Sequence, residues 1–140
     1  MSNLLGWIIS IAVISMACVL SGNVSMFLDT QTFIVILGFV YGLSIAVFGW
    51  RHTLASISGI KHLFSKQSVK NPELSYIYKT KIKFSFWAGG ISLLISIVAI
   101  ANNLDDLSVL GYALAVALLS LVYPVILSGA LYYPLYKKLA

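Results

Sequence analysis

Charged residues are scarce in this sequence of 140 residues: they make up 9% of it, whereas 60% is hydrophobic. A soluble globular domain carries roughly 25% charged residues, so this chain has too few to cover a surface that faces water. The single cysteine, Cys18, cannot form an internal disulfide. The scarcity of charge argues against a soluble enzyme and predicts that the apolar residues face lipid, and the single cysteine argues against a secreted disulfide scaffold.

The residue patterns of known catalytic and metal sites are also missing. The sequence has no His or Cys cluster at metal-ligand spacing, no nucleophile–base pair and no glycine-rich phosphate loop. We therefore predict that the chain is not an enzyme and uses no metal or other cofactor. His52 and His62 lie among basic residues and are interpreted as solvated.

Four apolar runs, at about 4–20, 33–50, 84–101 and 109–134, occupy most of the chain. Each is close to the ~20 residues that a helix needs to cross the hydrocarbon core. They predict an all-α membrane protein with four transmembrane helices in a single membrane domain, residues 1–140. The alternative that the first run is a cleaved signal is weaker, because Met1-Ser2-Asn3 contains no basic residue.

The basic residues predict the orientation of these spans. Every Lys and Arg lies either in the segment 51–83 or after the fourth run, whereas Asp29, Asp105 and Asp106 lie in the two opposite loops. Lys and Arg near span ends are retained on the cytoplasmic side, so we expect the segment 51–83 and both termini to be cytoplasmic. The net charge of +5 then reflects topology and attraction to anionic lipid, and it does not indicate nucleic acid.

The segment 51–83 has a helical pattern of its own. Leu54, Ile57 and Phe64 recur at helical spacing with Ser and Lys between them, which predicts a short helix on the membrane surface. Asn71-Pro72 ends that pattern. From Glu73 onward, the spacing predicts a second helix that continues into the third apolar run.

The apolar runs contain no Asp, Glu, Lys, Arg or His, so we do not expect this chain to hold a translocated proton by itself. They do contain stripes of small residues at helical spacing. These stripes are Gly38, Gly42 and Ala46; Gly89, Ser92, Ser96 and Ala99; and Ala113, Ala117, Ser120, Pro124 and Ser128. For the first stripe we favour simple helix packing. For the other two, packing and a narrow, weakly polar wall around another helix are both open interpretations. Pro124 leaves the carbonyl of Ser120 without its usual helical partner.

The last two spans resemble the MotA branch of the MotA/TolQ/ExbB proton-channel family. The resemblance rests on the ordered combination of Asn103 to Ser108 with its Asp105-Asp106 pair, Leu110-Gly111, the block from Ala115 to Tyr123, Pro134 and Lys138-Leu139. Asp29, the residues 32–38 and Gly42 are similar to the second span of the family and the loop before it.

This resemblance implies a homopentameric ring in the bacterial inner membrane around a single-span partner of the MotB/ExbD type that carries a membrane Asp. Ion flow would protonate that Asp and turn the ring, so that the complex converts ion flow into mechanical work. The resemblance further implies an ion path lined by residues of spans three and four: Ser92, Leu93, Ser96, Ala113, Ala117, Ser120, Leu121, Tyr123 and Pro124.

The sequence departs from the family at three places. The large cytoplasmic domain of flagellar stators is replaced by the short segment 51–83, which argues against flagellar torque. The paired threonines of span four become Ser120 and Leu121, and the threonine of span three falls near Leu93, which favours protons over sodium. Pro124 stands where the family usually has glycine.

Two other functions remain as alternatives. One is a structural membrane module that assembles a complex without conducting ions. The other is a small four-helix efflux transporter. We rank it lower because such transporters need an acidic residue within the membrane, and these spans contain none.

Overall fold

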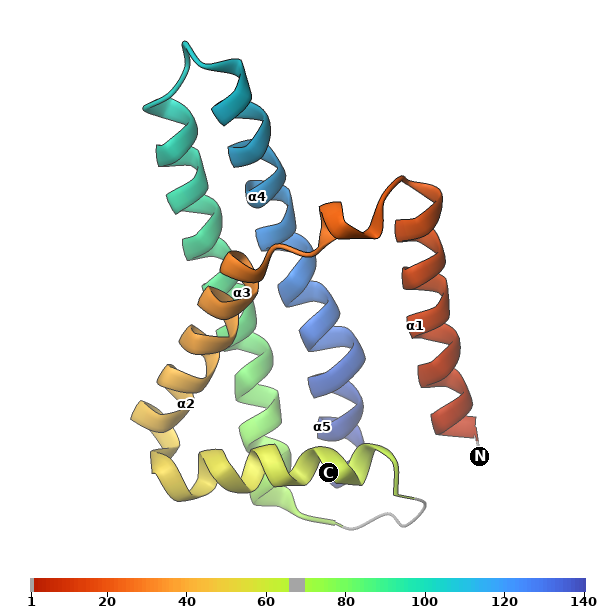
Figure 1. Ribbon diagram of the computed structural model, residues 1–140. Helices are drawn as coiled ribbons and strands as arrows, with labels where there is room; N and C mark the ends of the chain where they lie inside the picture. The colour runs from red at the N-terminus through yellow and green to blue at the C-terminus, as the bar shows by residue number, and fades with distance from the viewer. Residues whose placement is uncertain (1, 66–69) are drawn as a thin grey trace.

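In the computed structural model, which describes residues 2–65 and 70–140, the described chain is helical and contains no strand (Figure 1). The elements are, in chain order, α1 (Ser2–Leu20), the 3-10 turn η1 (Val24–Phe27), α2 (Thr30–Ser58), the 3-10 turn η2 (Gly59–Leu63), α3 (Pro72–Ala101), α4 (Leu107–Ile126), the π-helical segment η3 (Leu127–Tyr132) and α5 (Tyr133–Leu139). The predicted all-α class is therefore confirmed.

Three helical stretches, Val24–Leu63, Pro72–Ala101 and Leu107–Leu139, are long and apolar enough to cross a membrane. They contain the second, third and fourth predicted spans. The first run forms a shorter apolar helix, Leu5–Leu20. Both chain ends lie at the same end of the molecule as the segment between α2 and α3 (Figure 1). That the first run also spans the membrane, which would give four spans, stays a prediction, as do the cytoplasmic side of the termini and the pentamer.

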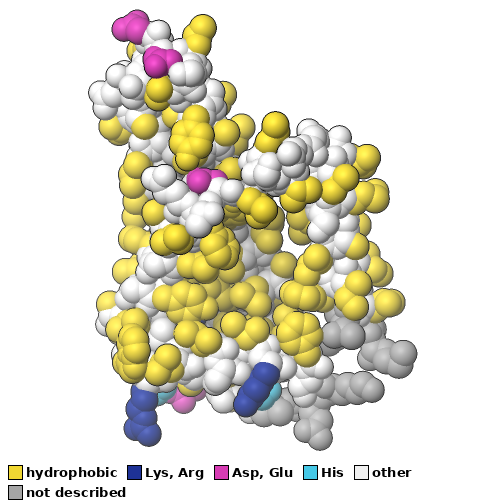
Figure 2. All heavy atoms as spheres, in the orientation of Figure 1, with side chains coloured by type: hydrophobic (Ala, Val, Ile, Leu, Met, Phe, Trp, Pro, Cys, Tyr) yellow, Lys and Arg dark blue, Asp and Glu magenta, His cyan; other side chains and the backbone are white. Residues whose placement is uncertain are grey.

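The basic side chains gather at one end of the molecule. On the face shown in Figure 2, the visible Lys and Arg side chains lie at the end that holds the termini, whereas Asp or Glu side chains lie at the opposite end, part-way along and beside the basic end. Hydrophobic side chains cover most of the height between the two ends (Figure 2). This distribution is the one expected of a multi-pass membrane chain.

A sharp turn inside α2 separates its apolar part from the segment that follows. Gly49 has φ 78° and ψ 168°, a conformation that is essentially restricted to glycine. After this turn the rest of α2 and η2 run across the end of the other helices (Figure 1). Residues 50–63 are thus helical, as their spacing predicts, and they lie crosswise.

The start of α3 follows from Asn71 and Pro72. The Asn71 Oδ1 accepts a hydrogen bond from the Leu74 amide at 3.0 Å, and Pro72 occupies the first turn, where its missing N–H costs nothing. The helix then continues without interruption to Ala101. The predicted second cytoplasmic helix and the third apolar run are therefore one element.

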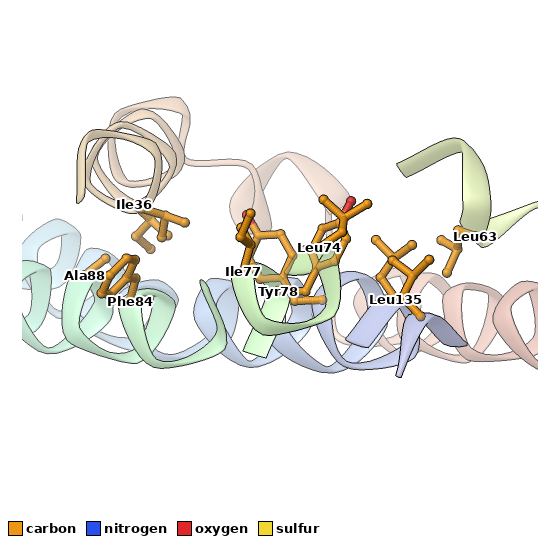
Figure 3. Close-up of a cluster of buried hydrophobic side chains, with 11 residues drawn as sticks. Ile36, Leu63, Leu74, Ile77, Tyr78, Phe84, Ala88 and Leu135 are labelled. Carbon is orange, nitrogen blue, oxygen red and sulfur yellow. The ribbon is translucent and has the colours of Figure 1, made fainter. Parts of the chain in front are cut away.

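The buried core lies where α2, α3 and the end of the chain meet, near the crosswise segment. Figure 3 shows Ile36 of α2 beside Phe84 and Ala88 of α3, and Leu135 of α5 near Leu63 of η2. Two hydrogen bonds tie the end of the chain to the start of α3. The Asn71 amide donates to the carbonyl of Leu139 at 3.0 Å, and the Ser75 hydroxyl donates to the carbonyl of Tyr136 at 2.9 Å.

Helix α1 is attached mainly through Trp7. None of the side chains described for α1 is buried. The Trp7 Nε1 donates a hydrogen bond to the carbonyl of Ala130 at 2.7 Å, and the ring lies edge-on to Phe64 with centroids 5.4 Å apart. Ala130 lies in the π-helical segment η3, just before Pro134, which has no N–H of its own. The indole thus donates to a backbone carbonyl at an irregular part of the last long helix.

Replacing Gly49 with alanine should destabilise the turn between α2 and the crosswise segment. An L residue at this φ and ψ costs on the order of 1–3 kcal/mol. A Cβ at Gly42, which lies inside the regular part of α2, meets nothing within 4 Å, so Gly42→Ala is the matched control. Thermal unfolding of the purified protein should show a lower midpoint for Gly49→Ala alone. Equal midpoints for the two variants would contradict the structure of this turn.

Candidate functional site

The stripes of small residues on α3 and α4 lie largely inside the chain. The most extensive contact between elements of the described chain joins these two helices. Six of the nine residues predicted to line the ion path are buried on them: Ser92, Ser96, Ala113, Ala117, Ser120 and Pro124. Small residues at a helix contact in lipid allow the backbones to approach closely. Within the single chain, these six residues therefore pack α3 against α4, which is the first of the two interpretations of the stripes.

The closest approach of the two helices is at Gly89. A Cβ placed there would lie 2.5 Å from the Pro124 Cγ and 2.6 Å from the carbonyl oxygen of Ser120. That oxygen is the one that Pro124 leaves without an N–H donor. It faces the backbone of α3 inside the helix contact.

The other three predicted residues are at least partly exposed. Leu121 is 48% exposed, and Leu93 is half-buried and lines an apolar groove. The Tyr123 hydroxyl donates to the carbonyl of Phe27 at 2.6 Å and accepts from the amide of Asp29 at 2.7 Å. Tyr123 thus fastens α4 to the start of α2. The role of all nine residues in an ion path stays a prediction about an assembly.

Several hydroxyls of the stripes are occupied by their own helices. The Ser96 Oγ donates to the carbonyl of Ser92 at 3.0 Å, and the Ser120 Oγ donates to the carbonyl of Ala117 at 2.7 Å. The buried Oγ of Ser128 has no hydrogen-bond partner within the part of the chain that the structure describes. This segment is π-helical, and such irregular turns are frequent at functional sites.

Two acids of the family-like motifs cap helices. An oxygen of Asp29 accepts the Thr32 amide at 3.2 Å at the start of α2, and Asp106 accepts the Ser108 amide at 3.0 Å at the start of α4. Hydrogen bonds from the Ser108 side chain, and then from backbone amides, hold the pKa of Asp106 below its usual range. These motif positions therefore have a structural role in a single chain.

Lys81 is an interior residue, whereas the sequence predicts it as one of the basic residues of the cytoplasmic segment 51–83 and as part of its second helix. Its side chain is fully buried. The Nζ donates to the Ser56 Oγ at 2.6 Å, and it lies 4.1 Å from the centroid of the Tyr41 ring. The signal that could have revealed this was the spacing, because Ile77, Lys81 and Ser85 lie on the same face of α3.

No carboxylate accompanies this ammonium among the residues that the structure describes. Glu73 lies elsewhere, near the surface, where its Oε1 is 3.0 Å from the His52 Nε2. A neutral hydroxyl and aromatic rings therefore hold the charge. Since the carbonyl of Ser56 also accepts the Tyr78 hydroxyl at 2.5 Å, Ser56 joins the crosswise part of α2 to α3 through two contacts.

Some chemistry is absent from the described chain. Residues 2–65 and 70–140 contain no group of three or more His, Cys, Asp or Glu side chains placed to hold a metal ion. The notable polar features are the α3–α4 contact and the buried Lys81.

Comparison with known proteins gives one local similarity. No family model matches the sequence. A stretch of 52 residues, 37% of this chain, is 42% identical to the chemotaxis protein PomA of Vibrio alginolyticus and covers 21% of that protein. The chain thus matches about a fifth of the length of this relative. The similarity gives limited support to the resemblance with the MotA branch and, at a coarse level, to a subunit of a motor or ion channel.

Alanine at Gly89 should weaken the α3–α4 contact, whereas alanine at the adjacent Gly90 should not. The added Cβ at Gly89 would overlap the Pro124 ring and the Ser120 carbonyl, while Gly90 has nothing within 4 Å. Overpacking of this kind costs typically ~1–3 kcal/mol, and the helix propensity of alanine favours Gly90→Ala by up to ~1 kcal/mol. Unfolding in mixed micelles, followed by circular dichroism, measures both. A Gly89→Ala protein as stable as Gly90→Ala would contradict this contact.

Removing the Ser56 hydroxyl should destabilise the fold only while Lys81 is present. Ser56→Ala leaves a buried ammonium without its oxygen acceptor, which costs about 1–3 kcal/mol. In a Lys81→Met background the same change should cost little, because no charge remains to be satisfied. A double-mutant cycle of unfolding free energies measures this difference. Equal costs of Ser56→Ala in the two backgrounds would show that the Lys81–Ser56 contact contributes nothing.

Proposed function

We propose that this chain is a ring-forming subunit of a proton-driven motor or channel complex in the bacterial inner membrane. In this proposal five copies surround a single-span partner of the MotB/ExbD type, and ion flow through their interface drives mechanical work. The observation that carries the proposal is the 42% identity to PomA over 52 residues. It agrees with the resemblance of the third and fourth spans to the MotA branch.

The absence of charge from the apolar runs supports an acid supplied from outside this chain. The runs 4–20, 33–50, 84–101 and 109–134 contain no ionisable residue other than Cys18 and tyrosines. A group that carries protons across a membrane is normally an acid or a histidine in the span. The partner is therefore proposed to carry the Asp that is protonated.

The nine predicted residues have different roles under this proposal. The six buried ones keep α3 and α4 at a short, fixed separation, so that the pair moves as one unit. Leu121 provides an apolar, exposed side chain toward the ion path, Leu93 lines the apolar groove on α3, and Tyr123 anchors the start of α2. With few free hydroxyls to replace the hydration shell of sodium, the proposed ion is the proton.

A transport assay with the partner tests this proposal. The chain is reconstituted in liposomes with a neighbouring single-span protein that contains one membrane Asp, and proton uptake is recorded with a pH-sensitive dye. We expect uptake that disappears when the partner carries Asp→Asn, and native mass spectrometry should count five copies of this chain. Uptake no greater than with the Asp→Asn partner would refute conduction. A sodium gradient in place of the proton gradient tests the choice of ion.

A non-conducting assembly module is the second candidate, because most of the small residues pack inside a single chain. Leu121→Trp changes an exposed position on α4, and Val13→Trp makes the same change at an exposed position on α1. If the proposal holds, Leu121→Trp lowers uptake several-fold in a complex that is still intact, and Val13→Trp does not. Loss of the complex in parallel with loss of uptake would favour the assembly module.

A further inference from the structure

One face of α3 changes from cationic to apolar along its length. With 100° of rotation per residue, Lys79, Lys83, Trp87, Gly90 and Leu94 project within about 80° of one another. The two lysines, Trp87 and Leu94 are exposed, and Gly90 is half-buried. A single surface thus carries positive charge near the start of α3 and apolar side chains toward the other end.

A second cation joins this face from α5. The Lys79 Nζ lies 5.9 Å from the centroid of the Tyr136 ring. The Lys137 Nζ lies 5.5 Å from the centroid of the same ring and 5.9 Å from that of Tyr133. Two ammonium groups on different helices therefore converge on one aromatic ring, which attracts each of them.

No carboxylate pairs with either ammonium among the residues that the structure describes. Glu73 is the one acidic side chain between the second and third runs or after the fourth, and its Oε1 lies 3.0 Å from His52. Two unneutralised ammonium groups beside one ring make this end of the face positively charged, so it attracts an anion. The exposed Tyr133 ring beside them suits the level of lipid headgroups.

An apolar groove begins one turn beyond Lys83. It has a volume of about 550 Å³. It is lined by Phe39 of α2 and by Phe86, Trp87, Gly90, Ile91, Leu93 and Leu94 of α3. Nothing lies within 4 Å of a Cβ placed on Gly90, so the absence of a side chain there keeps the groove open. The groove continues the cationic face in the direction of the apolar run.

We propose that this surface binds one anionic phospholipid, with its phosphate at the cationic end that Lys79 and Lys137 form beside Tyr136 and an acyl chain in the groove. The two lysines attract a phosphate. The adjoining groove binds an apolar chain, so a phosphate that carries a long acyl chain is preferred to free phosphate. The order of the two features along α3 matches the order of headgroup and chain in a bilayer leaflet. The site does not depend on whether the complex conducts ions.

Lipid titration by native mass spectrometry tests the site. The full chain in detergent is titrated with phosphatidylglycerol and with phosphatidylcholine that has the same acyl chains. Lys79→Gln with Lys137→Gln should weaken phosphatidylglycerol binding by roughly 10- to 30-fold and leave phosphatidylcholine binding nearly unchanged. The matched control, Lys61→Gln with Lys70→Gln, removes the same charge from two other exposed lysines and should change binding less than about twofold. Equal losses in both double variants would overturn the site.

A change in the groove tests the acyl-chain part separately. Gly90→Leu fills open space, so the protein should fold and should bind both lipids several-fold more weakly. Unchanged binding by a folded Gly90→Leu protein would overturn the groove assignment. Displacement of phosphatidylglycerol by equimolar glycerol phosphate would show a soluble-phosphate site, and it would also overturn the proposal.

A second copy of the chain is the other occupant that such a face can accept. In a Cys18→Ser background, Trp87→Cys reports on it through disulfide formation in bilayers. Efficient cross-linking between copies that added phosphatidylglycerol does not reduce would overturn the lipid site. Absence of cross-linking, together with lysine-dependent lipid binding, is the result expected.

Discussion

The last long helix has to accommodate two prolines, and the contacts made beside them hold the other helices in place. Pro124 and Pro134 have no backbone N–H to donate, and backbone groups left unpaired are costly in lipid. Ala130 accepts the Trp7 indole, which brings α1 to the rest of the chain. The carbonyl of Ser120 lies against Gly89, where α3 and α4 approach most closely. The attachment of one helix and the closest approach of two others thus both lie beside a proline of the last long helix.

The polar groups divide between those that hold the fold and those that face outward. Hydroxyls inside the α3–α4 contact are bonded to their own helices, so they supply close packing without fixed charge. Among the residues that the structure describes, Lys81 is the one buried charge, and it lies among the crosswise part of α2, Tyr41 and Tyr132, with no acid beside it. The contact between the apolar parts of α3 and α4 is therefore uncharged, and the buried charge lies at the cationic end of the molecule.

Local signals in the sequence predicted local structure well. The apolar runs and the Asn71-Pro72 helix start depend on neighbouring residues, and the structure contains the helices they indicate. The spacing of small residues identified the faces of α3 and α4 that are buried. It did not identify what covers them, because a stripe of small residues suits a neighbouring helix of the same chain as well as another subunit. The burial of Lys81 depends on Ser56, 25 residues away, and no pattern within one helix reveals such a partner.

The burial of Lys81 also couples two parts of the fold. An isolated α3 would leave this ammonium in contact with water, because its long side chain can reach the solvent. The charge loses its water only when the part of α2 beyond Gly49 lies across it and Ser56 replaces the hydration shell. The packing of the crosswise part against α3 and the desolvation of this charge are therefore one event.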